Sequence, residues 1–277
     1  MAVLKCGRFD IDLERPRIMA IINTTPDSFS GDGLGHDIDA ALRRCESAVA
    51  AGAHILDIGG ESTRPGSDSV SEQEELDRVV PLVERLADWP VPVSIDTVKP
   101  AVMRASLAAG ASLINDINGF RAPGAIEAVS DSDAALCVMH MQGEPRSMQA
   151  APHYDDVVGE VIDFLDRQVR VLEGQGVARE RIVLDPGFGF GKTLEHNLAL
   201  MRALDRFLGT GYPLLIGVSR KSMLGAITGR AVADRTVASV AAALIAIERG
   251  ARIVRVHDVA QTRDAVAVWE AVRFGAS

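Results

Sequence analysis

Short apolar runs alternate with longer amphipathic stretches along almost the whole chain. The runs are rich in β-branched residues and end at a polar residue, which predicts buried strands. The stretches between them, such as Asp39–Gly52 and Ser71–Trp89, repeat apolar residues every three or four positions, which predicts helices. The eight predicted strands are Arg17–Asn23, His54–Gly60, Val91–Thr97, Leu113–Ile117, Ala135–His140, Arg181–Gly187, Pro213–Ser219 and Ala251–Asp258.

Alternating strands and helices predict a parallel sheet with right-handed crossovers. Eight such units are the number that closes a (β/α)8 TIM barrel, which typically has about 250 residues. A doubly wound open sheet explains the alternation but not the eight units, and no GxGxxG motif follows the first strand. We therefore predict an α/β fold in which residues 1–277 form a single TIM-barrel domain. The alternation around Cys6 and Gly7 predicts a short hairpin over Val3–Leu13 that covers the N-terminal end of the barrel.

Composition narrows the possible classes of function. Hydrophobic residues make up 47% of the chain and charged residues 24%, as in an ordinary globular protein. The net charge of −9 argues against nucleic-acid binding, which needs a basic surface. The longest apolar run, Val237–Ile247, is too short to span a membrane, and the N-terminal residues lack the apolar core of a signal peptide. Cys6, Cys45 and Cys137 have no CxxC spacing, so we interpret them as packing residues of a cytoplasmic protein.

Polar residues collect where the predicted strands end, and in a barrel these ends form the rim on which active sites are built. An Asp at a strand end can also cap the next helix, but capping does not explain so many polar ends on one rim. Arg255 and His257 share a strand face, and this cationic pair on the last strand indicates an anion. Asp96, Asn115 and Asp185 suit a flat heterocycle rich in amide groups. The polar ends are Asn23, Asp57, Asp96, Asn115, Asp116, His140, Asp185, Ser219, Lys221, Arg255 and His257.

Three loops rich in Gly or Pro follow the first, second and sixth predicted strands, over 23–35, 61–67 and 187–192. We interpret them as segments that cover a ligand, with ordinary turn chemistry as the alternative. The third loop lacks the GxxxxGK[ST] spacing of a phosphate-binding loop.

Eight motifs lie along the chain: Ala20–Ser30, Asp57–Gly66 (DIGGESTRPG), Ser94–Thr97 (SIDT), Asn115–Ile117, Met139–Pro145 (MHMQGEP), Leu184–Lys192 (LDPGFGFGK), Ser219–Gly225 (SRKSMLG) and Arg255–Asp258 (RVHD). With these motifs the sequence resembles the dihydropteroate synthases, the pterin-binding enzymes of folate biosynthesis. The resemblance extends from Ile18 to Trp269. It departs from the family at Gly31-Asp32-Gly33, where the acidic residue is displaced by one position, so no role is carried over to Asp32.

The resemblance implies a transferase that condenses 6-hydroxymethyl-7,8-dihydropterin diphosphate with 4-aminobenzoate to give 7,8-dihydropteroate and diphosphate. It implies Mg²⁺ as cofactor, Asn23 as the residue facing the metal, and a site targeted by sulfonamides. The implied pterin-binding residues are Thr63, Asp96, Asn115, Met139, Asp185, Phe190, Lys221 and Arg255. The implied diphosphate-binding residues are Asn23, Arg255 and His257. The implied 4-aminobenzoate-binding residues are Phe29, Thr63, Arg64, Pro65, Lys221 and Ser222.

We expect catalysis by charge stabilisation, because the arylamine is itself the nucleophile. The residues expected to act are Asp96, Asp185, Lys221, Arg255 and His257. Diphosphate leaves first in a dissociative, carbocation-like step. We expect the carboxylate of 4-aminobenzoate at Ser219–Ser222, where a helix starts, with Arg64 closing over it. Two alternatives are a methyltetrahydrofolate-binding barrel of a corrinoid methyltransferase, which differs at Ser219–Ser222, and a non-catalytic pterin carrier.

The segment Thr236–Glu248 is apolar almost all round. Its small residues allow close helix packing, and the family resemblance favours a homodimer formed near it. The other expected partners are the small-molecule substrates, with neither nucleic acid nor membrane. The alternative for this helix is full burial within one subunit.

Overall fold

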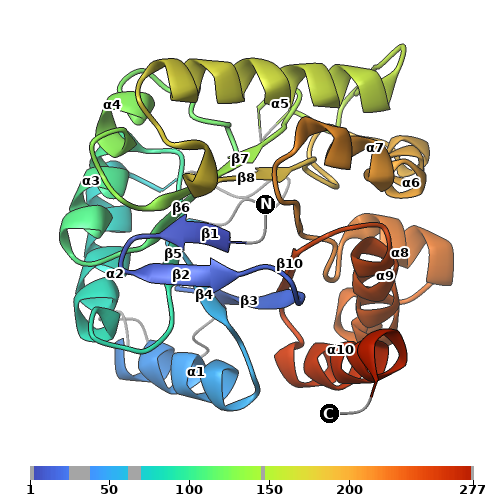
Figure 1. Cartoon of the computed structure of the whole chain (residues 1–277), viewed down its shortest axis with the longest axis horizontal. Helices are drawn as coiled ribbons and strands as arrows, with labels where there is room; N and C mark the ends of the chain where they lie inside the picture. Colours follow the sequence, from blue (N-terminus) through green and yellow to red (C-terminus); the bar gives the residue numbers. More distant parts are fainter. Residues whose placement is uncertain (1–2, 25–37, 62–69, 145–146, 276–277) are drawn as a thin grey trace.

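The computed structural model describes residues 3–24, 38–61, 70–144 and 147–275. These residues form a two-stranded antiparallel hairpin and an eight-stranded parallel sheet enclosed by helices (Figure 1). The hairpin strands are β1 (Val3–Cys6) and β2 (Phe9–Asp12). The sheet strands are β3 (Arg17–Asn23), β4 (Ile55–Gly59), β5 (Val93–Asp96), β6 (Leu113–Asp116), β7 (Ala135–Met139), β8 (Ile182–Asp185), β9 (Leu215–Ile216) and β10 (Ile253–Val256).

The helices lie outside the sheet and connect its strands (Figure 1). They are α1 (Ile38–Ala50), α2 (Glu72–Leu86), α3 (Pro100–Ala108), α4 (Ala125–Val129), α5 (Val157–Gly174), α6 (Leu194–Arg202), α7 (Leu204–Phe207), α8 (Ser222–Thr228), α9 (Thr236–Glu248) and α10 (Val259–Phe274). Ser71 lies just before α2 and accepts a hydrogen bond of 3.2 Å from the Glu74 N–H, so it caps the helix that was predicted to start there. None of the helices in the described ranges is long and apolar enough to cross a membrane.

The sheet closes into the predicted TIM barrel. The strand order is β8-β7-β6-β5-β4-β3-β10-β9, and the Leu184–Leu214 bridge joins β8 to the residue before β9. The Leu184 N–H donates to the Pro213 carbonyl oxygen at 3.0 Å across this seam. The seam is the weakest part of the ladder, because β9 has only two residues where Pro213–Ser219 was predicted as a strand.

Alternate residues of each strand face opposite sides of the barrel wall. On β3, Ile18 and Ala20 pack outward against the helices, whereas Met19 belongs to an inner cluster with Ile55 of β4 and Leu113 of β6. The same alternation continues toward the carboxyl end of each strand. It directs Asp57 of β4 and the other ring-site residues described below into the mouth of the barrel.

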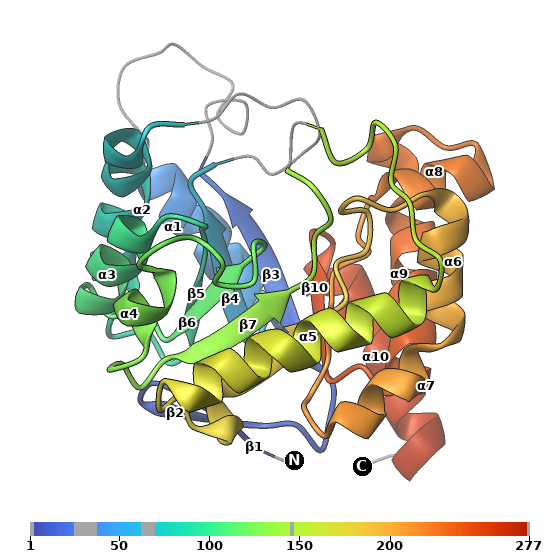
Figure 2. The same cartoon turned by 90° about the horizontal axis from the view of Figure 1, so that it is seen from above.

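The hairpin closes the opposite end of the barrel, as predicted (Figure 2). Leu4, Cys6, Ile11 and Leu13 are buried and join the inner cluster of the barrel strands. Gly7 makes the turn with a φ of 57°, in the left-handed region that favours glycine. The carboxyl ends of the strands therefore form the open end of the barrel, and the hairpin seals the other end.

The three cysteines lie in the interior. Cys6 and Cys137 belong to the inner cluster, and Cys45 is a buried residue of α1 in the core between the helices and the sheet. Burial raises the pKa of Cys6 to about 12 and that of Cys45 to about 12. All three thiols are thus inert at neutral pH and act as packing residues.

Candidate active site at the carboxyl ends of the strands

A buried ion triad lies at the centre of the barrel mouth. Arg255 of β10 donates from Nε to Asp57 Oδ2 at 2.5 Å and from Nη2 to Asp96 Oδ2 at 2.8 Å. The Ser94 hydroxyl donates to the other Asp57 oxygen at 2.5 Å, and Asn115 Nδ2 lies 3.4 Å from Asp57 Oδ2. Asp57 is completely buried and Asp96 is 6% exposed. The triad therefore holds one side chain from each of β4, β5 and β10 together at the centre of the mouth.

Two hydrogen-bond acceptors remain open beside this triad. Asp96 Oδ1 and Asn115 Oδ1 are buried and have no hydrogen-bond partner among the described residues. A buried polar atom without a partner costs about 1–3 kcal/mol, so such atoms are rare unless a ligand completes them. Two acceptors on adjacent strands therefore indicate a ligand that presents N–H groups along one edge.

Asp185 and Lys221 lie on the neighbouring part of the rim. Asp185 Oδ1 accepts a hydrogen bond of 2.7 Å from the Gly187 N–H. Lys221 Nζ donates to the Phe188 carbonyl oxygen and lies 4.4 Å from the centroid of the Phe190 ring. An acid, an ammonium group and an aromatic face thus lie together at the end of β8.

Burial perturbs the pKa values of this site. It raises the pKa of Asp96 to about 7, although Arg255 opposes the shift, and it raises the pKa of Asp185 above its ordinary range. Burial also lowers the pKa of Lys221 to about 8, against the opposing effect of Asp185. Burial alone would lower the pKa of Arg255, but the carboxylates of Asp57 and Asp96 raise it above its ordinary value. Perturbed groups that cluster in one place are typical of functional sites.

An apolar cluster forms one wall of the mouth. Met139 of β7 packs with Ile117, Met141 and Met148, and the Phe190 ring lies against them. Met139 and Phe190 were predicted here. Met148 was not, because it lies in the irregular loop between β7 and α5, where no periodicity indicates which way a side chain faces. The wall offers a flat ligand a polarizable apolar face.

A cavity rich in cationic side chains opens between β3, α1 and the start of α10. Its volume is about 750 Å³, and its lining includes Asn23, Arg43, Arg44, Arg220 and His257 together with one acid, Asp258. Asn23 ends β3, next to Gly59 of β4 in the register of the two strands. The size and charge of the cavity suit an anion such as a diphosphate group.

Hydrogen bonds and an ion pair hold the far side of this cavity. His257 Nδ1 lies 3.0 Å from the Ser219 hydroxyl, and the His257 N–H donates to the same hydroxyl at 3.2 Å. Arg220 pairs with Asp258 at 2.5 Å and has a φ of 57°, a strained value for a residue with a side chain. These contacts fix the backbone from which Lys221 reaches the barrel mouth.

The expectation that all the polar strand ends converge is wrong for Asp116 and His140. Asp116 follows the inward-facing Asn115, and its two oxygens accept hydrogen bonds of 2.7 Å from the Asn118 and Phe120 N–H groups. His140 likewise follows the inward-facing Met139. It lies 2.9 Å from Lys192 Nζ, and burial together with this lysine lowers the pKa of His140 to about 2. Both side chains hold loops, and neither of them caps the helix that follows its strand.

Lys192 is a structural residue that sequence reasoning missed. Its buried ammonium group donates to the carbonyl oxygens of Gly187 at 2.9 Å and Phe190 at 3.0 Å, in addition to its contact with His140. A Cβ atom at Gly187 would lie 1.9 Å from the His140 carbonyl oxygen, so only glycine fits there. These contacts therefore fix the backbone of the loop that carries Phe190.

Ser222 does not cap α8 with its side chain, because Lys221 is the N-cap and Ser222 is the first helical residue. The Ser222 side chain is exposed. Phe29, Thr63, Arg64 and Pro65, four of the six residues predicted to bind 4-aminobenzoate, lie outside the described residues.

Comparisons with known proteins agree with this geometry. Residues 19–257 match the pterin binding enzyme family. The chain is 51% identical to the dihydropteroate synthase of Neisseria meningitidis serogroup C over 275 residues, covering 98% of this chain and 97% of the relative.

Two solved structures share both fold and sequence. The Burkholderia cenocepacia dihydropteroate synthase complexed with 7,8-dihydropteroate has a TM-score of 0.90 and 56% identity, over 98% of this chain and 96% of that one. The Xanthomonas albilineans dihydropteroate synthase with 4-aminobenzoic acid has a TM-score of 0.93 and 47% identity, over 99% and 98% of the two chains. The chain therefore belongs to the pterin-binding enzyme family and, within it, to the dihydropteroate synthases.

Proposed function

We propose that the site condenses 6-hydroxymethyl-7,8-dihydropterin diphosphate with 4-aminobenzoate, and that the pterin ring occupies the mouth beside the Arg255 triad. The observation that carries this placement is the pair of open acceptors, Asp96 Oδ1 and Asn115 Oδ1. A pterin presents amino and ring N–H groups along one edge, so it can satisfy both atoms. Product and 4-aminobenzoic acid complexes of relatives support the same pair of substrates.

Asp185 and Lys221 complete the ring site in this proposal. The free oxygen of Asp185 accepts from the ring, and the Lys221 ammonium group donates to a ring carbonyl or nitrogen atom. Met139 and Phe190 cover one face of the ring. Arg255 lies at the opposite side and bonds to Asp57 and Asp96, so it is held in place before substrate binds.

The diphosphate occupies the cationic cavity that Asn23 and His257 line. Mg²⁺ fits this arrangement, because Mg²⁺ usually takes few protein ligands and bonds mainly to substrate phosphates and water. Asn23 would hold it through its amide oxygen, and the described residues include no cluster of three or more His, Cys, Asp or Glu side chains that would form a cage. Bound there, the ion supplies charge neutralisation for the leaving diphosphate.

The reaction follows from these placements. The C–O bond to diphosphate breaks, its electron pair leaves with the diphosphate, and Arg255 and His257 stabilise that charge. The electron-rich dihydropterin delocalises the positive charge left on carbon, and the carboxylates of Asp96 and Asp185 stabilise it. The arylamine nitrogen then attacks that carbon and loses a proton. Among the described residues we find no side chain that must act as a covalent nucleophile.

The 4-aminobenzoate site stays a prediction. Lys221 lies where it can contact both substrates, and Ser222 is exposed at the start of α8. The cytoplasmic location also stays a prediction.

A coupled assay of diphosphate release tests the proposed reaction. We expect release that requires both substrates, and loss of release on removal of Mg²⁺ with a chelator and its recovery when Mg²⁺ is added back. A pterin carrier would bind the dihydropterin diphosphate and release nothing. A corrinoid methyltransferase domain would need a corrinoid, and the family comparison does not favour it.

Lys221 makes ligand binding depend on pH. Its pKa of about 8 means that the ammonium group loses its proton above pH 8, and with it the charge that strengthens its hydrogen bond to the ring. We expect affinity for a dihydropterin ligand to fall by up to about tenfold between pH 7 and 9. Calorimetry at several pH values measures this fall. In Lys221→Met the affinity is lower and no longer falls over this range, and a fall that persists in this variant would assign it to another group.

We also propose a homodimer that buries the outer faces of α9 and α10. The alternative of full burial within one subunit is excluded by the exposed Val237, which is 82% exposed, and Ile245, which is 48% exposed. On α10, Val272 is 85% exposed and Val268 67%. The two helices lie side by side (Figure 1), and Trp269 Nε1 of α10 donates to Glu248 at 2.5 Å. Exposed apolar residues gathered on one face typically mark an interface.

Light scattering at micromolar concentration is expected to give twice the mass of the chain. Val272→Glu places a charge on this face and is expected to shift the protein toward the monomer. Val171→Glu on α5 is the matched control, because Val171 is 46% exposed on another part of the surface. A monomeric parent protein would refute the proposal.

A further inference from the structure

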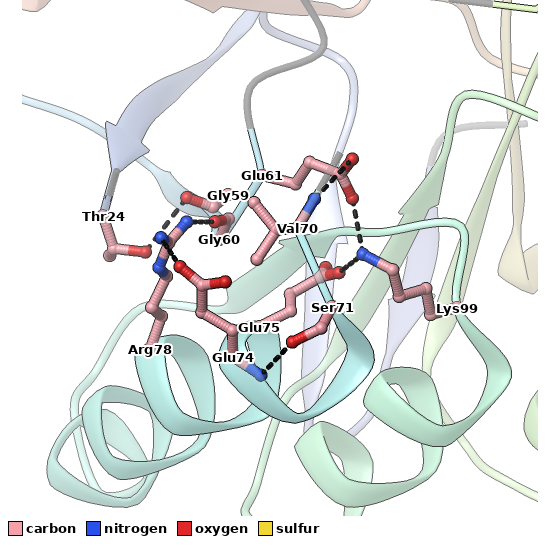
Figure 3. A network of polar contacts seen from close by, with 10 residues as sticks. All are labelled: Thr24, Gly59, Gly60, Glu61, Val70, Ser71, Glu74, Glu75, Arg78 and Lys99. Carbon is pink, nitrogen blue, oxygen red and sulfur yellow. Dashed lines mark hydrogen bonds and ion pairs between the residues drawn. The ribbon is translucent and has the colours of Figure 1, made fainter. Parts of the chain in front are cut away.

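Four charged side chains, here called the root cluster, gather beside the carboxyl end of β4: Glu61, Glu75, Arg78 and Lys99 (Figure 3). Glu75 is only 1% exposed and Arg78 only 5%. None of the four belongs to the pterin, diphosphate or 4-aminobenzoate residues discussed above. Charged side chains are seldom buried unless they are paired within the protein, so these four differ from surface charges that water solvates.

Lys99 joins two carboxylates that come from different parts of the fold. Its Nζ lies 2.5 Å from Glu61 Oε2 and 2.5 Å from Glu75 Oε2. Glu61 follows β4, Glu75 lies in the first turn of α2, and Lys99 immediately precedes α3. Burial alone would lower the pKa of Lys99, but the two carboxylates raise it above its ordinary value. The ammonium group is therefore charged at every physiological pH.

The root cluster and its neighbours hold the residues that flank the segments 25–37 and 62–69. Glu61 Oε1 accepts a hydrogen bond of 3.3 Å from the Val70 N–H, which ties together the two ends of the second segment. Arg78 donates to the Gly60 carbonyl oxygen at 2.7 Å. The first segment starts after Thr24, whose N–H and hydroxyl both donate to the Gly59 carbonyl oxygen, at 3.0 and 3.1 Å. Figure 3 shows these contacts in one place.

The same contacts connect to the ring site through short stretches of chain. Gly60 lies three residues after Asp57, and Lys99 lies three residues after Asp96. The backbone at Gly60 packs so closely on α2 that a Cβ atom there would lie 2.7 Å from Val79 and 2.8 Å from Glu75. Close packing therefore fixes the distance between the residues of the ring site and the residues that flank both segments.

We propose that the root cluster positions both segments for the arylamine substrate, with Lys99 as its central positioning residue. The proposal rests on the proposed function and on the prediction from the sequence that Phe29 of the first segment and Thr63, Arg64 and Pro65 of the second bind 4-aminobenzoate. The cluster contacts neither substrate. It acts by fixing where each segment leaves the barrel wall.

The energetics of the cluster favour a positioning role over a purely stabilising one. Glu75 Oε1 and Arg78 Nε are buried and have no hydrogen-bond partner among the described residues, and each such atom reduces stability. Buried ion pairs are often no more stabilising than apolar residues of the same volume. The cluster instead fixes the end of β4, the first turn of α2 and the start of α3 relative to one another.

Glu61→Gln is the main test. The glutamine keeps an oxygen for the Val70 N–H, but its amide nitrogen opposes the Lys99 ammonium group. We expect the KM for 4-aminobenzoate to rise by roughly 3- to 30-fold and the KM for the pterin substrate to change by less than about twofold, because couplings through packed networks are of this size. Equal changes in both constants, or no change in either, would overturn the proposal.

A second comparison separates positioning from stability. Lys99→Met leaves two carboxylates without their cation and is expected to lower both the melting temperature and the affinity for 4-aminobenzoate. The triple variant Lys99→Met/Glu61→Gln/Glu75→Gln removes all three charges, so its melting temperature should recover toward that of the parent. We expect its KM for 4-aminobenzoate to stay high. Recovery of KM together with melting temperature would show a merely structural role and refute the proposal.

Two further variants complete the design. Asp10→Asn removes a carboxylate from the exposed Lys5–Asp10 pair at the hairpin end of the barrel and is expected to leave both KM values unchanged. Arg64→Ala tests the underlying assignment, since it should raise the KM for 4-aminobenzoate more than that for the pterin substrate. If Arg64→Ala has no such effect, the role of Arg64 fails, while Glu61→Gln still decides the root cluster. If Arg64→Ala is selective and Glu61→Gln is not, the root cluster alone fails.

Discussion

Replacing Asp185 by asparagine is expected to weaken binding of a dihydropterin ligand by about 30- to 1000-fold, which corresponds to about 2–4 kcal/mol. The expected cause is local. The asparagine side chain can keep an oxygen toward the Gly187 N–H, from which Asp185 Oδ1 accepts at 2.7 Å in the parent protein. Its amide group then presents an N–H where the ring needs an acceptor, and the negative charge beside Lys221 is lost. Isothermal titration calorimetry measures the change, and thermal unfolding is expected to show little loss of stability.

Asp116→Asn is the matched control for this experiment. Asp116 is also a buried acid at a strand end, but both of its oxygens accept backbone N–H groups on the outer side of the barrel wall. This variant should lower the melting temperature and leave ligand affinity unchanged. The opposite pattern for Asp185→Asn, with lower stability and normal affinity, would mean that Asp185 serves only the turn at Gly187.

Arg255→Met is expected to lower the free energy of unfolding at pH 7 by about 3–5 kcal/mol and to abolish activity. The methionine leaves Asp57 and Asp96 buried at 0% and 6% exposure without their shared cation. The loss of stability is expected to shrink as the pH falls from 9 to 6. The folded-state pKa of Asp96 is about 7 with Arg255 present and rises above this value without it, so Asp96 of the variant takes up a proton within this range and then needs no cationic partner. Denaturant unfolding at both pH values measures the difference.

The triple variant Arg255→Met/Asp57→Asn/Asp96→Asn is the control for charge. It removes the cation and both carboxylates, so its stability should return toward that of the parent, whereas activity stays absent. A stable and active Arg255→Met variant would contradict both the structural and the catalytic role of the triad.

The sequence was sufficient to predict the barrel because the signal repeats in every unit. Each strand of the sheet is a short, mainly apolar run, and Gly52, Gly110, Gly176 and Gly250 all have positive φ values of 96°, 110°, 86° and 102° where a helix gives way to the next strand. The short β9 escaped prediction because its apolar run continues past the two residues that pair. An apolar run predicts that its residues are buried, but a buried residue need not form backbone hydrogen bonds with a neighbouring strand.

The strand residues of the site were predicted from their polar character at the strand ends, and the two-residue period of a strand was applied only to Arg255 and His257. That period places Asp96, Asn115, Asp185 and Arg255 at the mouth. Applied to β4, it would also have assigned a role to Asp57, which lies two residues after the inward-facing Ile55. Applied to neighbours in sequence, it would have separated Asn115 from Asp116 and Met139 from His140.

Loop residues gave no comparable signal. Lys192 and Met148 reach the site from irregular backbone, where side-chain direction has no fixed period. The root cluster joins three elements through contacts between residues 9 to 38 positions apart, which spacing along one element does not show. Such contacts become visible only when the chain has folded.

The alternation of faces along each strand limits how such an enzyme can diverge during evolution. Residues that face the site alternate along each strand with residues that pack against the helices. Inserting or deleting one residue within β4 would therefore exchange the position of Asp57 with that of Leu56 or Ile58. One such event would remove a partner of Arg255 and also place an aspartate against the helices. Substitutions can adjust either face separately, and length changes can accumulate in the connections after the strands. We therefore expect related sequences to differ in loop length while the number of residues in each strand stays constant.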